Sequence, residues 1–173
     1  MNVVAFTKVK AYNGWLSNMS AFPVIYENTT WKNAEALFQA LRFPDGDIRT
    51  QIYEEKSPMS AKMIAKKHVE NMTVVQRGPQ DVDNMLLVLM HKLKTNPNLC
   101  YRLRETGDAQ IIEDVTARGS SESNDFWGAR QMNGEWVGEN MLGELWMLLR
   151  TMLNDSETQH WFAPSSWNQV GYL

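Results

Sequence analysis

The chain has 173 residues, and its 43% apolar content supports one well-packed core but not two separate domains. A formal net charge of −3 provides no basic surplus for broad capture of duplex nucleic acid, and only a local cationic pocket is compatible with it. The single cysteine, Cys100, excludes an internal disulfide, a CxxC redox pair and a zinc ribbon.

The longest apolar run, MLLVLM at residues 85–90, is much shorter than the roughly 20 residues that a membrane-spanning helix needs. The N-terminus also lacks a charged and then apolar leader. We therefore expect a cytoplasmic protein that has no membrane partner.

The first thirty residues predict small strands and loops, because short β-prone runs alternate there with NG, SN and FP turn signals. Regular helix is expected from Trp31, with Thr29 or Thr30 as the N-cap. Pro44 and Gly46 in the following FPDGD segment end this helix.

Helical patterns dominate the middle of the chain. A short helix is predicted at 47–56, and Ser57, followed by a proline, is a typical N-cap for the next helix. The segment 81–97 predicts a buried amphipathic helix that is capped by Asp81 or Asp83.

The last third mixes element types. Residues 98–106 predict a helix, 111–115 a strand and 117–136 a loop. A final helix is expected at 139–153. The side of this helix that faces the core is predicted to consist of Met141, Leu145, Leu148, Leu149 and Met152. The aromatic tail at 154–173 is expected to pack on the body as an extension. Together these elements predict an α+β fold, namely a mainly α-helical single domain over residues 1–173 with a few short strands.

One carboxylate stands out as a candidate catalytic group. In the segment WKNAEALFQALRF (31–43), Glu35 falls at the border of the apolar stripe, beside Trp31 and Phe38. Carboxylates next to apolar rings tend to gain proton affinity and suit acid or base work. The structural alternative is that Glu35 lies at the rim and pairs with Lys32 or Gln39.

Three other segments could bind a ligand. In SNDFWGA (123–129) an acidic loop residue lies next to Trp127, and binding of a base and a ribose needs an aromatic ring for stacking beside an acidic group. The alternative is that a buried Trp only anchors the loop. WLSNM (15–19) offers hydroxyl and amide groups but also fits an ordinary turn. A lysine row that starts at Lys62 could meet a phosphate or form a solvated face.

Several other chemistries are excluded by missing motifs. The chain has no GxGxxG or GxxxxGK[ST] loop, and its three histidines lack HExxH or HxxxH spacing. Cys100 lies inside a predicted helix, and we interpret it as a buried core residue and not as a nucleophile. We expect no metal and no cofactor.

The motifs occur in an order that resembles a known family. WLSN, WxxxExxxFQAxRF, SPMSAK, MxxxxxxK from Met85 to Lys92, TGD, IIED, FWG and GENMLGELWMxLR extend from about residue 12 to 152. This series is similar to the NADAR superfamily, also called the YbiA-like family. The resemblance implies a YbiA-like fold and an N-glycosidase or ADP-ribose glycohydrolase activity.

The resemblance also implies roles for individual residues. Cleavage of a C1′–N bond passes through a cationic ribose, so the matching helix glutamate, Glu35, is the main catalytic candidate. The candidate catalytic residues are Glu35, Asp125 and Lys92. The candidate substrate-binding residues are Ser17, Asn18, Trp31, Arg42, Lys62, Arg77, Asn124, Trp127, Gly128 and Asn140, of which Asn140 is expected to brace the pocket.

The chain departs from the family pattern at three places. Gln76 or Arg77 stands where a Trp is usual, and a guanidinium can replace the ring as a stacking surface. Asn124 occupies the usual Asp position, with Asp125 one step later. Arg42 replaces a lysine and cannot form a Schiff base, whereas Lys92 matches another frequent lysine.

Two functions follow from these observations. The leading one is hydrolysis of a small phosphoribosyl compound, such as a riboflavin-pathway ribosylaminopyrimidine phosphate, or of an ADP-ribosyl compound, such as an ADP-ribosylated guanine base in DNA. The alternative is a non-catalytic module that binds ADP-ribose or a related nucleotide. The sequence does not define the oligomeric state.

Overall fold

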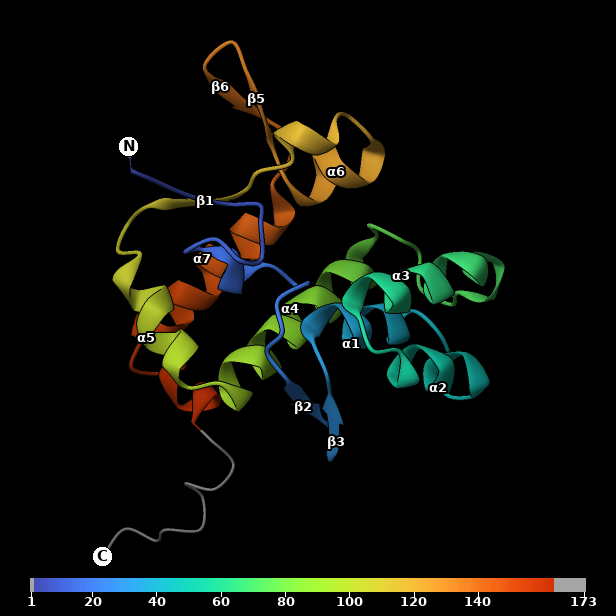
Figure 1. Ribbon diagram of the computed structural model, residues 1–173. Helices are drawn as coiled ribbons and strands as arrows, with labels where there is room; N and C mark the ends of the chain where they lie inside the picture. Colours follow the sequence, from blue (N-terminus) through green and yellow to red (C-terminus); the bar gives the residue numbers. More distant parts are fainter. Residues whose placement is uncertain (1, 164–173) are drawn as a thin grey trace, which may run out of the picture.

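Helices form most of the computed structural model, which describes residues 2–163 of the chain (Figure 1). The α-helices are α1 (Ala34–Ala40), α2 (Asp47–Glu54), α3 (Pro58–Lys67), α4 (Pro79–Thr95), α5 (Asn98–Glu105), α6 (Glu122–Trp127) and α7 (Met141–Asn154). Short 3-10 helices are η1 (Gly14–Leu16), η2 (Val69–Asn71), η3 (Thr116–Arg118) and η4 (Gln159–Phe162). This arrangement is the expected mainly helical α+β fold.

The strands pair two by two within the described part of the chain. They are β1 (Val3–Phe6), β2 (Val24–Tyr26), β3 (Thr29–Trp31), β4 (Gln110–Glu113), β5 (Arg130–Met132) and β6 (Glu135–Val137). β1 runs parallel to β4, with Val3 opposite Gln110, while β2–β3 and β5–β6 are antiparallel hairpins. The parallel pair fixes β4 beside α7, and Figure 1 shows the β5–β6 hairpin projecting beyond α6.

The core lies where α1, α4 and α7 meet. Leu37 of α1, Leu89 of α4 and Trp146 of α7 are fully buried there. Burial of one large apolar side chain contributes roughly 1.5–3 kcal/mol, so these contacts fix the relative positions of the three helices. α2 and α3 pack on the other side of α1 (Figure 1).

The start of α1 differs from the sequence prediction. Thr29 and Thr30 belong to β3, and the N-cap is Asn33, whose side chain accepts a hydrogen bond of 2.9 Å from the Ala36 backbone N–H. The run TTW, with two β-branched threonines and an aromatic residue, pairs with β2, and this pairing outweighs the helical continuity of the apolar pattern. The helix therefore begins three residues later than expected.

The start of α4 also differs. Its N-cap is Gly78, and Pro79 occupies the first turn. Asp83 is exposed, whereas Asp81 is completely buried in an ion pair with Arg42. The prediction that Asp81 or Asp83 caps this helix was wrong, because Asp81 bonds to another element.

The predicted loop at 117–136 contains regular structure. Ser121 caps α6 by accepting a hydrogen bond of 3.1 Å from the Asn124 backbone N–H. Asn133 and Gly134 then adopt positive φ angles of 52° and 88° and close the β5–β6 hairpin. The polar composition concealed both elements, because an exposed short helix and an exposed hairpin need few apolar residues.

The other predicted elements agree with the structure, apart from the buried face of α7. α2, α3 and α5 occupy the expected segments, and Ser57 caps α3. On α7 the buried side is formed by Leu142, Leu145, Trp146, Leu149 and Leu153, while Leu148 is 45% exposed. Phe162 of the tail is buried against the body; residues 164–173, on which the rest of the tail prediction falls, lie outside the described residues.

Candidate functional site

A cavity of about 300 Å³ opens on the side of α1 that carries Glu35. Its walls come from the segment after η1, from α1, α3 and α6, from the segment before α4, and from β4 with the residues that follow it. We call it the Glu35 cavity. Eight predicted site residues line it: Ser17, Asn18, Glu35, Arg42, Lys62, Arg77, Asn124 and Trp127.

Glu35 lies in the first turn of α1 and is only 6% exposed. Its backbone N–H donates to the Asn18 carbonyl over 3.1 Å, which ties the WLSN segment to the helix. Its Oε1 accepts a 2.8 Å hydrogen bond from Gln39 Nε2, and no ion pair joins it to Lys32, which donates instead to α2 carbonyls. Glu35 therefore lies in the cavity wall, bonded to Gln39, and not at an outer rim paired with Lys32.

A second carboxyl group, which the sequence reading did not single out, faces the same cavity. Glu113, the last residue of β4, is buried and accepts a 2.9 Å hydrogen bond from Arg118 Nη1. Burial raises the pKa of the Glu113 carboxyl; Arg118 lowers it, and the charge of Glu35 raises it again. The acidic end of the IIED run was the available signal for this residue.

Asn18 presents an unsatisfied acceptor at the cavity. Its Nδ2 donates to the Met85 sulfur over 3.0 Å, while its buried Oδ1 has no hydrogen-bond partner. Buried acceptors are normally paired, so this oxygen is suited to a ligand hydroxyl or N–H group. The neighbouring Ser17 Oγ accepts a 3.2 Å bond from the Met19 backbone N–H and shapes the turn.

The cationic groups at the cavity come from three elements. Lys62 of α3 is exposed, Arg77 forms a 2.6 Å ion pair with the exposed Glu122, and Arg118 contacts Glu113. The Arg77–Glu122 pair lies at the surface, where ion pairs are weak and can exchange for a ligand anion. Arg42, by contrast, is buried and bound to Asp81, so it does not offer a free charge.

Lys92, an expected catalytic residue, lies behind the wall and does not line the cavity. Its side chain is fully buried, and Nζ donates to the Trp15 carbonyl (2.6 Å), the Ser17 carbonyl (2.9 Å) and Ser20 Oγ (2.9 Å). Burial lowers the pKa of Lys92 to about 7. Because all three donors are used, the geometry gives Lys92 the task of holding the WLSN segment and not that of a nucleophile.

Trp127 forms an aromatic wall of the cavity. Its ring contacts Phe38 edge-on at a centroid distance of 5.5 Å and Phe126 at 4.9 Å. It is buried, so it both anchors α6 and presents part of its surface to the cavity. The two interpretations offered by the sequence are therefore compatible.

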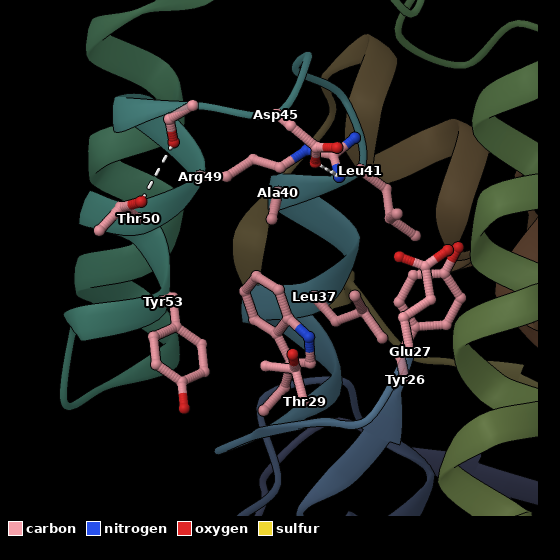
Figure 2. A pocket seen from close by; sticks show the side chains of 12 residues that line it. Tyr26, Glu27, Thr29, Leu37, Ala40, Leu41, Asp45, Arg49, Thr50 and Tyr53 are labelled. Atoms are coloured by element: carbon pink, nitrogen blue, oxygen red, sulfur yellow. Dashed lines mark hydrogen bonds and ion pairs between the residues drawn. The ribbon is translucent and has the colours of Figure 1, made fainter.

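Trp31 does not join this site. It lines a second cavity, of about 270 Å³, on the other side of α1 between the β2–β3 turn and α2 (Figure 2). Tyr53 packs edge-on against Trp31 at 5.2 Å. In Figure 2 the Tyr53, Arg49 and Thr50 side chains extend from α2 along this second cavity, which we call the Trp31 cavity.

Three further predicted residues support the site from outside. The Asp125 carboxylate accepts a 2.7 Å hydrogen bond from Arg130 Nε. Hydrogen bonds from Arg130 and Ser120 lower the pKa of Asp125. Gly128 lets α6 approach β4, since a Cβ there would lie 2.5 Å from the Glu113 carbonyl oxygen. Asn140, which was expected to brace the pocket, accepts a hydrogen bond of 3.0 Å from the Glu113 backbone N–H in β4. Asp125, Gly128 and Asn140 therefore do not line the cavity.

The fold and the cavity define a helical α+β domain with a cavity that is lined by carboxyl groups and by cationic side chains. The chain belongs to the NADAR family, because the NADAR domain matches residues 5–154. It is also similar to the NMR structure of the E. coli protein YbiA, at 26% identity and a TM-score of 0.73, over 92% of this chain and 89% of that chain. No curated protein matches the chain significantly. The family and the YbiA-like fold together point to a glycosidase-type role.

Two further findings apply to residues 2–163. None of the helices there is both long and apolar enough to cross a membrane. Nor do three or more His, Cys, Asp or Glu side chains of this part gather in a group that could hold a metal ion.

Proposed function

We propose that the protein is an N-glycosidase that hydrolyses the C1′–N bond of a phosphoribosyl or ADP-ribosyl compound. The observation that supports this most strongly is the pair of carboxyl groups, Glu35 and Glu113, that face one cavity in unlike environments. A buried carboxyl group with a raised pKa, as in Glu113, suits the role of the acid, and a second carboxylate at the same cavity suits the role of the base.

Glu113 is the proton donor in this proposal. Its raised pKa favours the protonated form, which can deliver a proton to the base as the C1′–N electron pair moves to that nitrogen. Arg118 then stands beside the carboxylate that remains after transfer. The leaving base departs neutral, which lowers the barrier to bond cleavage.

Glu35 is the group that meets the cationic sugar. Gln39 holds one of its oxygens by a 2.8 Å hydrogen bond, and the carboxylate faces the cavity. It can stabilise the positive charge that develops at C1′ and accept a proton from the water that adds there. The products are the free base and the ribose with a new hydroxyl group, so atoms and charge balance.

The remaining wall residues fit a phosphorylated riboside. The unpaired Asn18 Oδ1 can accept from a ribose hydroxyl, and the exposed Lys62 with Arg77 can bind phosphate. Trp127 offers its ring to a base. In this arrangement the cationic side chains bind the phosphate end of the substrate and Trp127 binds the base, whatever base is released.

Base release tests the proposal. The protein is incubated separately with a ribosylaminopyrimidine phosphate and with an ADP-ribosylated guanine oligonucleotide, and chromatography measures the free base. Wild type should release base from at least one of them. Glu35→Gln should abolish release with an unchanged circular dichroism spectrum, whereas the exposed Glu144→Gln on α7 should leave the rate intact.

The alternative is a binding module for ADP-ribose or a related nucleotide. The orientation of Asp125 toward Arg130 supports it, because this acidic group is withdrawn from the cavity. Ligand binding by wild type without release of base from either compound would establish the module. A fully active Glu35→Gln variant would remove Glu35 from the mechanism.

A further inference from the structure

Four buried polar side chains form a hydrogen-bonded series that starts behind the cavity wall and ends at Glu35. Asp81 of α4 accepts from Arg42 Nε at 2.8 Å and from Arg42 Nη2 at 2.7 Å. Arg42 Nη1 donates to Gln39 Oε1 at 3.0 Å, and Gln39 Nε2 donates to Glu35 Oε1 at 2.8 Å. Asp81 is 0% exposed and does not line the Glu35 cavity.

The chemistry of these groups gives the series one direction. A guanidinium can only donate, so Gln39 must turn its carbonyl oxygen to Arg42. The amino group of Gln39 then has to face Glu35, whose Oε1 is held as an acceptor. The rotation of the Gln39 amide, and with it the orientation of Glu35, is thus set by the position of the Arg42 guanidinium.

Asp81 is the group that fixes this guanidinium. The two-pronged contact is short and buried, and it holds the Arg42 guanidinium on the Asp81 carboxylate. Without it, Arg42 would be a buried cation within reach of the cavity and free to pair with the catalytic carboxylate. The Arg42 guanidinium also lies over the Phe38 ring, with its carbon 4.4 Å from the ring centroid, and this contact gives the guanidinium a second partner.

Asp81 has a second attachment, to the segment that presents Arg77. Its Oδ2 accepts a 2.7 Å hydrogen bond from the Arg77 backbone N–H, and Arg77 has a φ of 62°. This left-handed conformation is unfavourable for a residue with a Cβ, so an outside contact must hold it. One carboxylate therefore anchors both a cavity cation and the series that leads to Glu35.

We propose that Asp81 is a positioning residue of this site, acting through Arg42 and Gln39 to hold Glu35 in its reactive orientation. The catalytic part of this inference rests on the proposed N-glycosidase function. The orientation part concerns the folded protein alone, and the two parts are tested separately.

Kinetics test the catalytic part through a double-mutant cycle of Asp81→Asn and Gln39→Met. Each single variant should lower kcat about tenfold, and the double variant should be within about twofold of Gln39→Met, because Asp81 acts through Gln39. Asp83→Asn, which removes an exposed charge from the same helix, should leave kcat unchanged. Equal losses from Asp81→Asn in both backgrounds, or no loss at all, would overturn the inference.

NMR of the substrate-free protein tests the orientation part. The Gln39 side-chain amide and the Arg42 Nε–H should give shifted signals in Asp81→Asn and unshifted ones in Asp83→Asn. If Asp81→Asn does not fold, the double variant Arg42→Gln/Asp81→Asn removes both charges of this buried pair and should show the same Gln39 shift. If the Gln39 side-chain signals of the Asp81 variants are the same as in wild type, the inference is refuted, whatever the enzymatic activity of these variants. Moved signals without any cleavage by wild type refute the proposed function and leave the fixed orientation of Glu35 standing.

Discussion

Glu35 and Glu113 reach the same cavity from different elements, one from the first turn of α1 and the other from the end of β4. Both are buried, but their partners differ: Glu35 accepts from a neutral amide, whereas Glu113 accepts from the Arg118 guanidinium. The roles proposed for the two residues depend on this difference. The sequence singled out Glu35 but did not show this difference, because the burial of Glu113 and its contact with Arg118 arise only in the folded chain.

The pH dependence of the reaction tests the role of Glu113. Its raised pKa means that it carries a proton at lower pH and loses it as the pH rises through that pKa, so kcat/KM should fall on the alkaline side. Glu113→Gln should lower kcat/KM by about 10²–10⁴-fold and remove this alkaline fall, because the donor is gone. The measurement is kcat/KM against pH for both proteins.

A matched control is Glu135→Gln, on the exposed β6 strand, which should keep both the rate and the profile. An alkaline fall that persists in Glu113→Gln would assign the proton transfer to another group.

At the scale of elements, the site depends on where α1 begins. Asn33 caps the helix and the Glu35 N–H bonds to the Asn18 carbonyl, so the first turn of α1 is fixed from two sides. The sequence predicted the helix and its candidate catalytic glutamate but placed the N-cap at Thr29 or Thr30. The error arose because hairpin pairing is a contact between segments, and local propensity does not report it.

Substitution of the observed cap should show this difference. Asn33→Ala removes the hydrogen bond to the Ala36 N–H and should lower the free energy of unfolding by about 1 kcal/mol, with an upper range near 2. Thr30→Ala, at the exposed position that the sequence favoured, should change it by less than about 0.5 kcal/mol. Urea unfolding measures both, and a larger loss in Thr30→Ala would restore the predicted cap.

For the whole molecule, the ordered motifs were enough to predict the family, the α+β class and eight residues of the cavity wall. They could not show that Trp31 faces the opposite side of α1, because Trp31 belongs to β3 and not to the helix that the pattern predicted there. They also could not show that Arg42 is bound to Asp81, since the partners are 39 residues apart. Local patterns predict elements and candidate residues, whereas long-range contacts decide which of those residues share a cavity.

The presence of two cavities on opposite sides of α1 gives the account a direct structural test. A crystal structure of Glu35→Gln with an intact riboside substrate would show which cavity binds it. We expect the substrate to occupy the Glu35 cavity, with its anomeric carbon about 3–3.5 Å from the side chain at position 35. A substrate held in the Trp31 cavity, or one whose anomeric carbon points away from position 35, would contradict it.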